Sequence, residues 1–97
     1  MEVSQIRNED KVIYKIKGKI DANVQPVLEQ AVQLDGVKNL VFDFKEVDYI
    51  FSAGLRVLLQ AQKQMNATGG KMKIIHANEI VRKMLQIVGF DSLMDIE

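Results

Sequence analysis

The stretch NLVFDFKEVDYIFSAGLRVLL, residues 39–59, changes its hydrophobic pattern part of the way along, and this change decides the fold. Residues 39–44 are almost continuously apolar, which is typical of a central strand covered on both faces. From about Ser52 to Asn66 the apolar residues recur at helical spacing instead. The side of this predicted helix that faces the core carries Leu55, Leu58, Leu59 and Met65. A buried strand that leads into an amphipathic helix is typical of an α/β fold.

Two further strands are predicted before this stretch, over residues 2–6 and 11–20. In the second strand, Val12, Tyr14 and Ile16 alternate with lysines, which predicts one buried face and one face exposed to solvent. The short polar link between the two strands suits a hairpin. The lysine row, which could suggest nucleic-acid binding, has no aromatic residues between its members, so we interpret it as a solvated strand face. It consists of Lys11, Lys15, Lys17 and Lys19.

The remaining elements alternate. Residues 21–34 have helical spacing, with Asp21 or Asn23 able to cap the start. A strand over 71–75 follows the Gly69-Gly70 break, and a helix is predicted over 77–88. The predicted inward residues are Val24, Val27, Leu28, Ala31 and Val32 in the first of these helices, and Ile80, Val81, Met84, Leu85 and Val88 in the last. Residues 92–96 suit a short final strand.

The order β-β-α-β-α-β-α-β predicts one α/β domain over residues 1–97. Its mixed, mostly parallel sheet begins with a hairpin, and three to four helices pack mainly on one side of it. Thirteen basic and thirteen acidic residues cancel, which leaves little counterion release to drive nucleic-acid binding. The chain has no cysteine and no apolar run near the ~20 residues that a membrane span needs. Since no signal peptide is visible either, we expect a soluble cytoplasmic protein, a monomer or weak dimer.

Enzymatic chemistry finds little support in the sequence. His76 is the only histidine and has no cysteine or second histidine with which to share a metal. Ser52, His76 and Asp48 could form a triad, but FSAGL lacks the first glycine of the nucleophile elbow. No phosphate-cradling glycine loop occurs. The carboxylates Asp43 and Glu46, like Asp48, are interpreted as solvated loop charges. We therefore expect no enzyme, metal or cofactor.

Ser52 has two physical explanations. A hydroxyl at the first turn of a helix can cap unpaired backbone N–H groups. A phosphate at the same place is also favoured, because the helix terminus carries partial positive charge. The position alone leaves both explanations open.

The order of motifs resembles the STAS domain family, in particular the bacterial anti-sigma factor antagonists. The resemblance covers nearly the whole chain and rests on four features together. These are Gly18-x-x-Asp21 before the first helix, Ser52-Ala53-Gly54-Leu55 after the third strand, Gly69-Gly70 before the fourth strand, and the closing Gly89-Phe90. The usual family motif is Asp-Ser-Ser-Gly-Leu, so Phe51 and Ala53 depart from it.

The resemblance implies a function in partner switching. In this family an anti-sigma factor that is also a serine kinase phosphorylates the antagonist, and a cognate phosphatase is expected to reverse this. Unphosphorylated antagonist binds the kinase and releases a sigma factor. Ser52 matches the phosphoacceptor and Asp21 matches a loop residue that contributes to partner contact. The predicted partner-binding residues are Asp21, Asn23, Phe51, Ser52, Ala53, Gly54, Leu55 and Arg56.

Two other hypotheses remain at this point. The same fold could be a constitutive scaffold or assembly module in which Ser52 only caps its helix. Alternatively, a deep pocket lined by Phe51, Tyr49 and His76 would indicate an enzyme or a small-ligand sensor.

Overall fold

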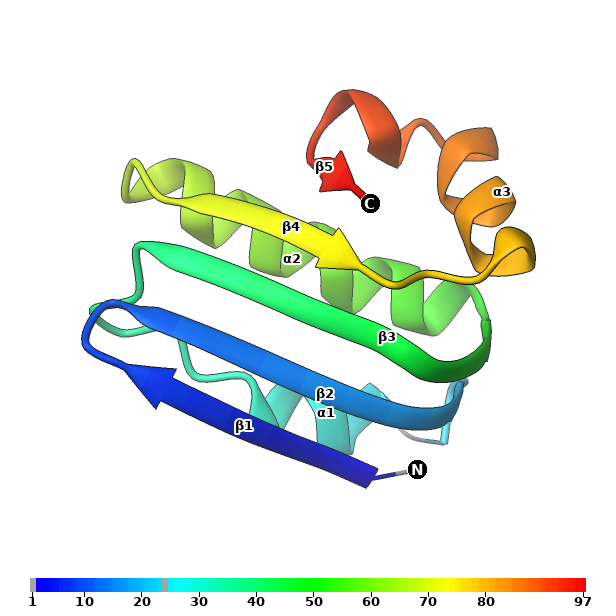
Figure 1. Ribbon diagram of the computed structural model, residues 1–97, viewed down its shortest axis with the longest axis horizontal. Helices are drawn as coiled ribbons and strands as arrows, with labels where there is room; N and C mark the ends of the chain where they lie inside the picture. The colour runs from blue at the N-terminus through cyan, green and yellow to red at the C-terminus, as the bar shows by residue number, and fades with distance from the viewer. Residues whose placement is uncertain (1, 24) are drawn as a thin grey trace.

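The computed structural model describes residues 2–23 and 25–97, which form a five-stranded sheet in the order β1-β2-β3-β4-β5 (Figure 1). β1 is antiparallel to β2, and the other neighbouring strands are parallel. This confirms the predicted α/β class, the opening hairpin and the mostly parallel sheet. The strands are β1 (Glu2–Asn8), β2 (Lys11–Ile20), β3 (Asn39–Ile50), β4 (Lys71–Ile75) and β5 (Asp95–Ile96).

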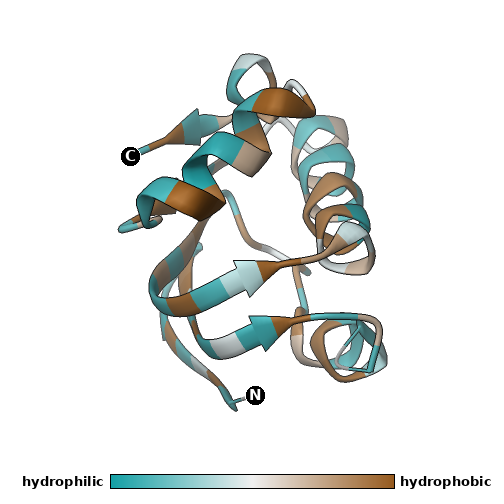
Figure 2. Cartoon of the chain, turned by 90° about the vertical axis from the view of Figure 1, so that its right-hand side faces the viewer, coloured by the Kyte–Doolittle hydropathy of each residue, from teal (hydrophilic) through white to brown (hydrophobic). Residues whose placement is uncertain are grey.

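Three α-helices and one short 3-10 helix accompany the sheet in the described residues. They are α1 (Gln25–Ala31), α2 (Ser52–Ala67), α3 (Glu79–Ile87) and η1 (Phe90–Ser92). Figure 1 shows α1 and α2 behind the sheet, and Figure 2 looks onto the edge where β2 and β3 end, with both helices on the same side of the sheet. The prediction that the helices lie mainly on one side is therefore confirmed.

The core lies between the sheet and these two helices. Tyr14, Phe42 and Phe44 are fully buried, and the rings of Tyr14 and Phe42 stack with their centroids 5.9 Å apart. The alternation in β2 is confirmed, because its predicted inward residues are buried and its lysines are exposed. Leu58 and Met65 of α2 are buried as predicted, whereas Leu55 and Leu59 are only partly buried.

The helical stripes predicted on α1 and α3 are wrong in part. α1 is shorter than residues 21–34, and of its predicted inward residues Leu28 is buried while Val27 is 54% exposed; Val24 lies outside the described residues. In α3, Val81 and Leu85 are buried, but Ile80 is 58% exposed, and Val88, which follows the end of the helix, is 48% exposed. The physical reason is that a short helix packed at the rim of a small sheet buries a narrower stripe than its apolar periodicity spans.

The carboxyl end of β3 extends beyond β4. β4 ends where Ile75 pairs with Asp43, seven residues before β3 ends at Ile50. The start of α3 takes the place of β4 there, because the Asn78 side-chain amide donates to the carbonyl oxygen of Val47 at 3.1 Å. Asn78 also caps α3 by accepting from the N–H of Val81 at 2.8 Å. The end of β3 is thus held firmly on the side of α3.

Candidate functional site

The candidate site lies where β2 and β3 end side by side. Ile20 and Ile50 are the last residues in register, and the N–H of Phe51 donates to the carbonyl oxygen of Ile20 at 2.8 Å. The loop that holds Asp21 and Asn23 leaves the sheet at the same edge. In this loop a carboxylate oxygen of Asp21 accepts from the N–H of Asn23 at 3.0 Å. The edge therefore joins two segments that are about thirty residues apart in sequence.

Ser52 is the first residue of α2 and is exposed. The N-cap position belongs to Phe51, with φ −102° and ψ 172°, and no side chain caps the helix. Of the two explanations that the sequence left open for Ser52, the helix cap is therefore not observed. The physical reason is that Ser52 already has helical geometry, whereas a capping side chain belongs to the extended residue before the helix. Within the described residues its hydroxyl makes no hydrogen bond.

The start of α2 leaves polar groups available to a ligand or a modification. The N–H groups of Gly54 and Leu55 both bond to the carbonyl oxygen of Phe51, at 2.9 and 3.1 Å. Those of Ser52 and Ala53 have no acceptor among the described residues. The first turn holds no acidic side chain, and Arg56 is exposed one turn further on. Because a helix N-terminus has partial positive charge, added negative charge at Ser52 is favoured.

Gly54 is buried, and its lack of a side chain allows the start of α2 to approach the sheet closely. A Cβ on Gly54 would lie 2.4 Å from Cγ2 of Ile20 and 2.9 Å from Cγ1 of Ile50, closer than real Cβ atoms come to other atoms. The missing side chain lets α2 begin directly against the ends of β2 and β3. Gly54 thus positions the exposed residues around it, and its place among the predicted partner-binding residues stays a prediction.

The other predicted partner-binding residues differ in exposure. Phe51 and Arg56 are exposed, and Ala53 and Leu55 are partly buried. Leu55 also packs against the core, so it has little surface left for a partner. Asn23 is exposed and Asp21 is half-buried. The surface that a partner can reach at this edge is thus centred on Phe51, Ser52 and Arg56.

Phe51 does not stand alone. Its ring lies 4.6 Å from the ring of Tyr49 between centroids, with the planes tilted by 57°. The predicted partner-binding residues did not include Tyr49. The signal that could have identified it is the period of a strand, because residues two apart at the end of β3 lie on the same face.

His76 pairs with Asp43, and not with Ser52 and Asp48 as the triad considered from the sequence would require. Its Nδ1 lies 3.0 Å from a carboxylate oxygen of Asp43, and within the described residues it has no hydrogen bond to Ser52 or Asp48. The interpretation of Asp43, Glu46 and Asp48 as loop charges is wrong, because all three lie within β3. β3 continues through them with a register shift against β2 between Asp43 and Glu46, so that Phe44 and Val47, three residues apart, both reach the core.

Burial of the Asp43 carboxyl raises its pKa. The N–H of Lys45, the hydrogen bond and charge of His76, and the charge of Lys15 together lower the pKa by more, so that it lies below its ordinary value of 3.8. The hydrogen-bonded pair of His76 and Asp43 ties β3 to the residue that follows β4. With His76 engaged by Asp43, the groups that a Ser52–His76–Asp48 triad would need are not assembled.

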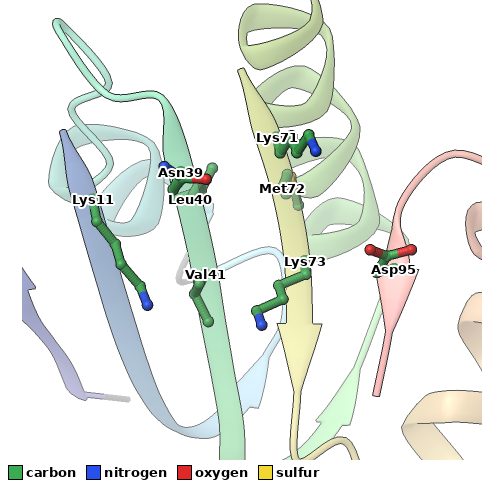
Figure 3. Close-up of a pocket in the computed structure, with 8 residues that line it drawn as sticks. All are labelled: Lys11, Asn39, Leu40, Val41, Lys71, Met72, Lys73 and Asp95. Atoms are coloured by element: carbon green, nitrogen blue, oxygen red, sulfur yellow. The ribbon is translucent and has the colours of Figure 1, made fainter.

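The face of the sheet that α1 and α2 do not cover carries a separate hollow of about 440 Å³ (Figure 3). Val41, which is only 3% exposed, lies between Lys11 of β2 and Lys73 of β4, and Lys71 lines the hollow nearer the start of β4. This hollow is near the amino ends of β3 and β4, and thus at the other end of the strands from Ser52. None of the hollows that we describe on residues 2–23 and 25–97 is lined by Tyr49, Phe51 or His76. A deep pocket at this edge, which would favour an enzyme or a sensor, is not among these hollows.

Within residues 2–23 and 25–97, no group of three or more histidine, aspartate or glutamate side chains is placed to hold a metal ion. No helix in the same residues has both the length and the apolar character that crossing a membrane requires.

Comparison with known proteins places the chain in a family. The profile of the STAS domain matches residues 2–97. The anti-sigma-B factor antagonist of Bacillus subtilis is 32% identical over 92 residues, which cover 93% of this chain and 84% of that protein. A solved structure of the anti-sigma factor antagonist SpoIIAA in its unphosphorylated form matches with a TM-score of 0.86 at 16% identity, over 99% of this chain and 88% of that one. SpoIIAA in the phosphorylated form matches with a TM-score of 0.73 at 16% identity, over 99% and 91%. The chain therefore belongs to the STAS domain family.

Proposed function

We propose that this chain is an anti-sigma factor antagonist whose binding to a protein partner is switched by phosphorylation of Ser52. The observation that carries the proposal is the state of the Ser52 hydroxyl, which is exposed, makes no hydrogen bond in the described structure and stands at an uncapped helix start. Relatives named as anti-sigma factor antagonists, and one named in a phosphorylated form, support the same function.

The proposed partner is an anti-sigma factor that is also a serine kinase. It transfers the γ-phosphoryl group of ATP to Oγ of Ser52, the hydroxyl proton passes to a base on the kinase, and ADP leaves. A cognate phosphatase returns the serine by hydrolysis. The antagonist supplies no catalytic group and holds no nucleotide of its own. Because ATP and the kinase are inside the cell, we place this exchange in the cytoplasm.

The phosphate changes the docking surface without disturbing the fold. It adds about two negative charges beside Phe51, where the unpaired N–H groups of Ser52 and Ala53 and the side chain of Arg56 favour it locally. A partner that covers this edge would have to desolvate that charge, so it would bind the phosphorylated form less well. The switch therefore acts through the partner interface.

The experiment is to incubate the purified chain with the serine kinases of its own organism and ATP, and to locate any phosphate by mass spectrometry. We expect modification at Ser52 and none in Ser52→Ala. Phosphate found only at other residues would overturn the proposal. If Ser52 stayed unmodified by every kinase, a constitutive scaffold with the same fold would be the better account.

A further inference from the structure

An exposed aromatic ring stands directly before the proposed phosphoacceptor. Phe51 is 43% exposed, whereas the other three phenylalanines, Phe42, Phe44 and Phe90, are buried. Aromatic side chains, phenylalanine among them, are enriched at protein interfaces, where a few residues carry most of the binding energy. We propose that Phe51, supported by Tyr49, is the anchor that inserts into an aliphatic pocket on the partner protein. This inference rests on the proposed function, because it concerns the partner that covers Ser52.

The anchor is held rigidly before any partner arrives. The Phe51 N–H is bonded to Ile20, and its carbonyl oxygen accepts from the N–H groups of Gly54 and Leu55. The ring of Tyr49 supports one side of the Phe51 ring, with 4.6 Å between centroids. A side chain that is fixed in advance loses little conformational entropy when it is buried. The arrangement is that of a preorganised contact residue.

The shape of this surface favours a protein partner over a small molecule. Sites for small ligands are concave, and none of the hollows that we describe on residues 2–23 and 25–97 is lined by Phe51 or Tyr49. A protruding ring needs its pocket on another surface.

A second copy of this chain offers no suitable pocket among the same hollows. Each of them has charged side chains in its lining, such as Lys11, Lys71 and Lys73 in the one shown in Figure 3 and Glu29 and Asp35 between α1 and α2. Inserting a phenyl ring there would remove water from charged groups without giving them partners. These hollows therefore do not favour a second copy, and we place the aliphatic pocket on the partner kinase that the proposed function names.

The adjacency of anchor and acceptor gives the switch its mechanism. Ser52 follows Phe51 directly, so a phosphate there would lie at the rim of the pocket that takes the ring. Full insertion of the ring would strip water from a dianion, which is costly in apolar surroundings. Phosphorylation thus works by preventing the anchor from seating.

The experiment measures the Kd of the purified partner kinase for the wild-type chain, Phe51→Ala, Phe51→Leu and Ile87→Ala. Ile87 is the matched control, since it is 84% exposed and lies at the end of α3. We expect Phe51→Ala to weaken binding about 30-fold or more, as for an interface hot spot. Phe51→Leu should keep most of the affinity and Ile87→Ala should keep all of it. Thermal unfolding of each variant confirms that it is folded.

The possible failures can be told apart. If a folded Phe51→Ala chain binds within threefold of wild type, or if Phe51→Ala instead dissociates a homodimer in sedimentation, the anchor proposal is overturned. If Phe51→Ala loses binding while phosphorylated Ser52 does not, the anchor stands and the proposed switch fails.

Discussion

The N–H of Phe51 donates a 2.8 Å hydrogen bond to the carbonyl oxygen of Ile20, which joins the end of β3 to the end of β2. This bond fixes the residue before Ser52 relative to the loop that begins at Asp21. The helix that follows can start at once because Gly54 has no side chain to hold it away from the sheet. The proposed phosphoacceptor is therefore exposed at the start of a helix that is held closely against the sheet.

Gly54→Ala should lower the free energy of unfolding. The new methyl group would meet Ile20 and Ile50, both fully buried, and forcing extra volume into a packed site costs about 1–3 kcal/mol. Glycine to alanine inside a helix ordinarily stabilises it by roughly 0.5–1 kcal/mol. Because overpacking lowers the free energy of unfolding and helix propensity raises it, urea unfolding shows which effect dominates. A Gly54→Ala chain more stable than wild type would contradict the close packing.

Ser52→Ala should leave stability almost unchanged, within about 0.5 kcal/mol, because the hydroxyl makes no hydrogen bond in the described structure. Asn78→Ala is the matched comparison and should cost about 1 kcal/mol, since Asn78 caps α3. Chemical denaturation of both variants measures this difference. Equal losses would show that Ser52 caps its helix after all.

Ser52→Asp should be slightly more stable than wild type at low ionic strength. The first turn of α2 holds no acidic residue, and a carboxylate near a helix N-terminus contributes about 0.3–1 kcal/mol. Salt should reduce the gain, and the neutral Ser52→Asn should not show it. A Ser52→Asp chain that melts below wild type would contradict this account of the helix end.

Asp43→Asn should remove a pH-dependent part of the stability. The folded-state pKa of Asp43 lies below its ordinary value of 3.8, since its interactions with Lys45, His76 and Lys15 outweigh the effect of burial. The unfolded carboxylate therefore takes up its proton at higher pH than the folded one. The ionised side chain stabilises the fold above about pH 4, and this contribution is lost as the pH falls through the folded pKa.

Unfolding measured from about pH 6 down to about pH 2 tests this sign. The stability difference between wild type and Asp43→Asn should shrink as the pH falls. Asp48→Asn, an exposed position on the same strand, controls for the loss of one negative charge. A difference that grows toward acid pH would contradict the expected direction.

Much of the fold could be predicted from the spacing of apolar residues. This spacing is alternating in β2, nearly continuous at the start of β3 and helical in α2, and each of these elements buries a long face. α3 was less predictable, since Ile80 and Val88 share the apolar period of the helix but lie beyond the part of it that the sheet covers. The spacing of apolar residues within one helix does not predict how wide a surface the rest of the protein offers to cover it.

The site was predictable where it depends on sequence neighbours and less so where it depends on distant contacts. The position of Ser52 at the start of a helix follows from the local pattern. The bond between Phe51 and Ile20, and the pair formed by His76 and Asp43, join segments about thirty residues apart. The sequence left the capping role open because a shift of one residue moves a serine from the N-cap into the first turn.

The most direct test of the central claim compares one partner with two forms of this chain, unphosphorylated and phosphorylated on Ser52 alone. Titration calorimetry with the purified kinase should show tight binding of the first form and binding weakened at least a hundredfold for the second. Equal affinity for both forms, with phosphate verified on Ser52 by mass spectrometry, would contradict the account.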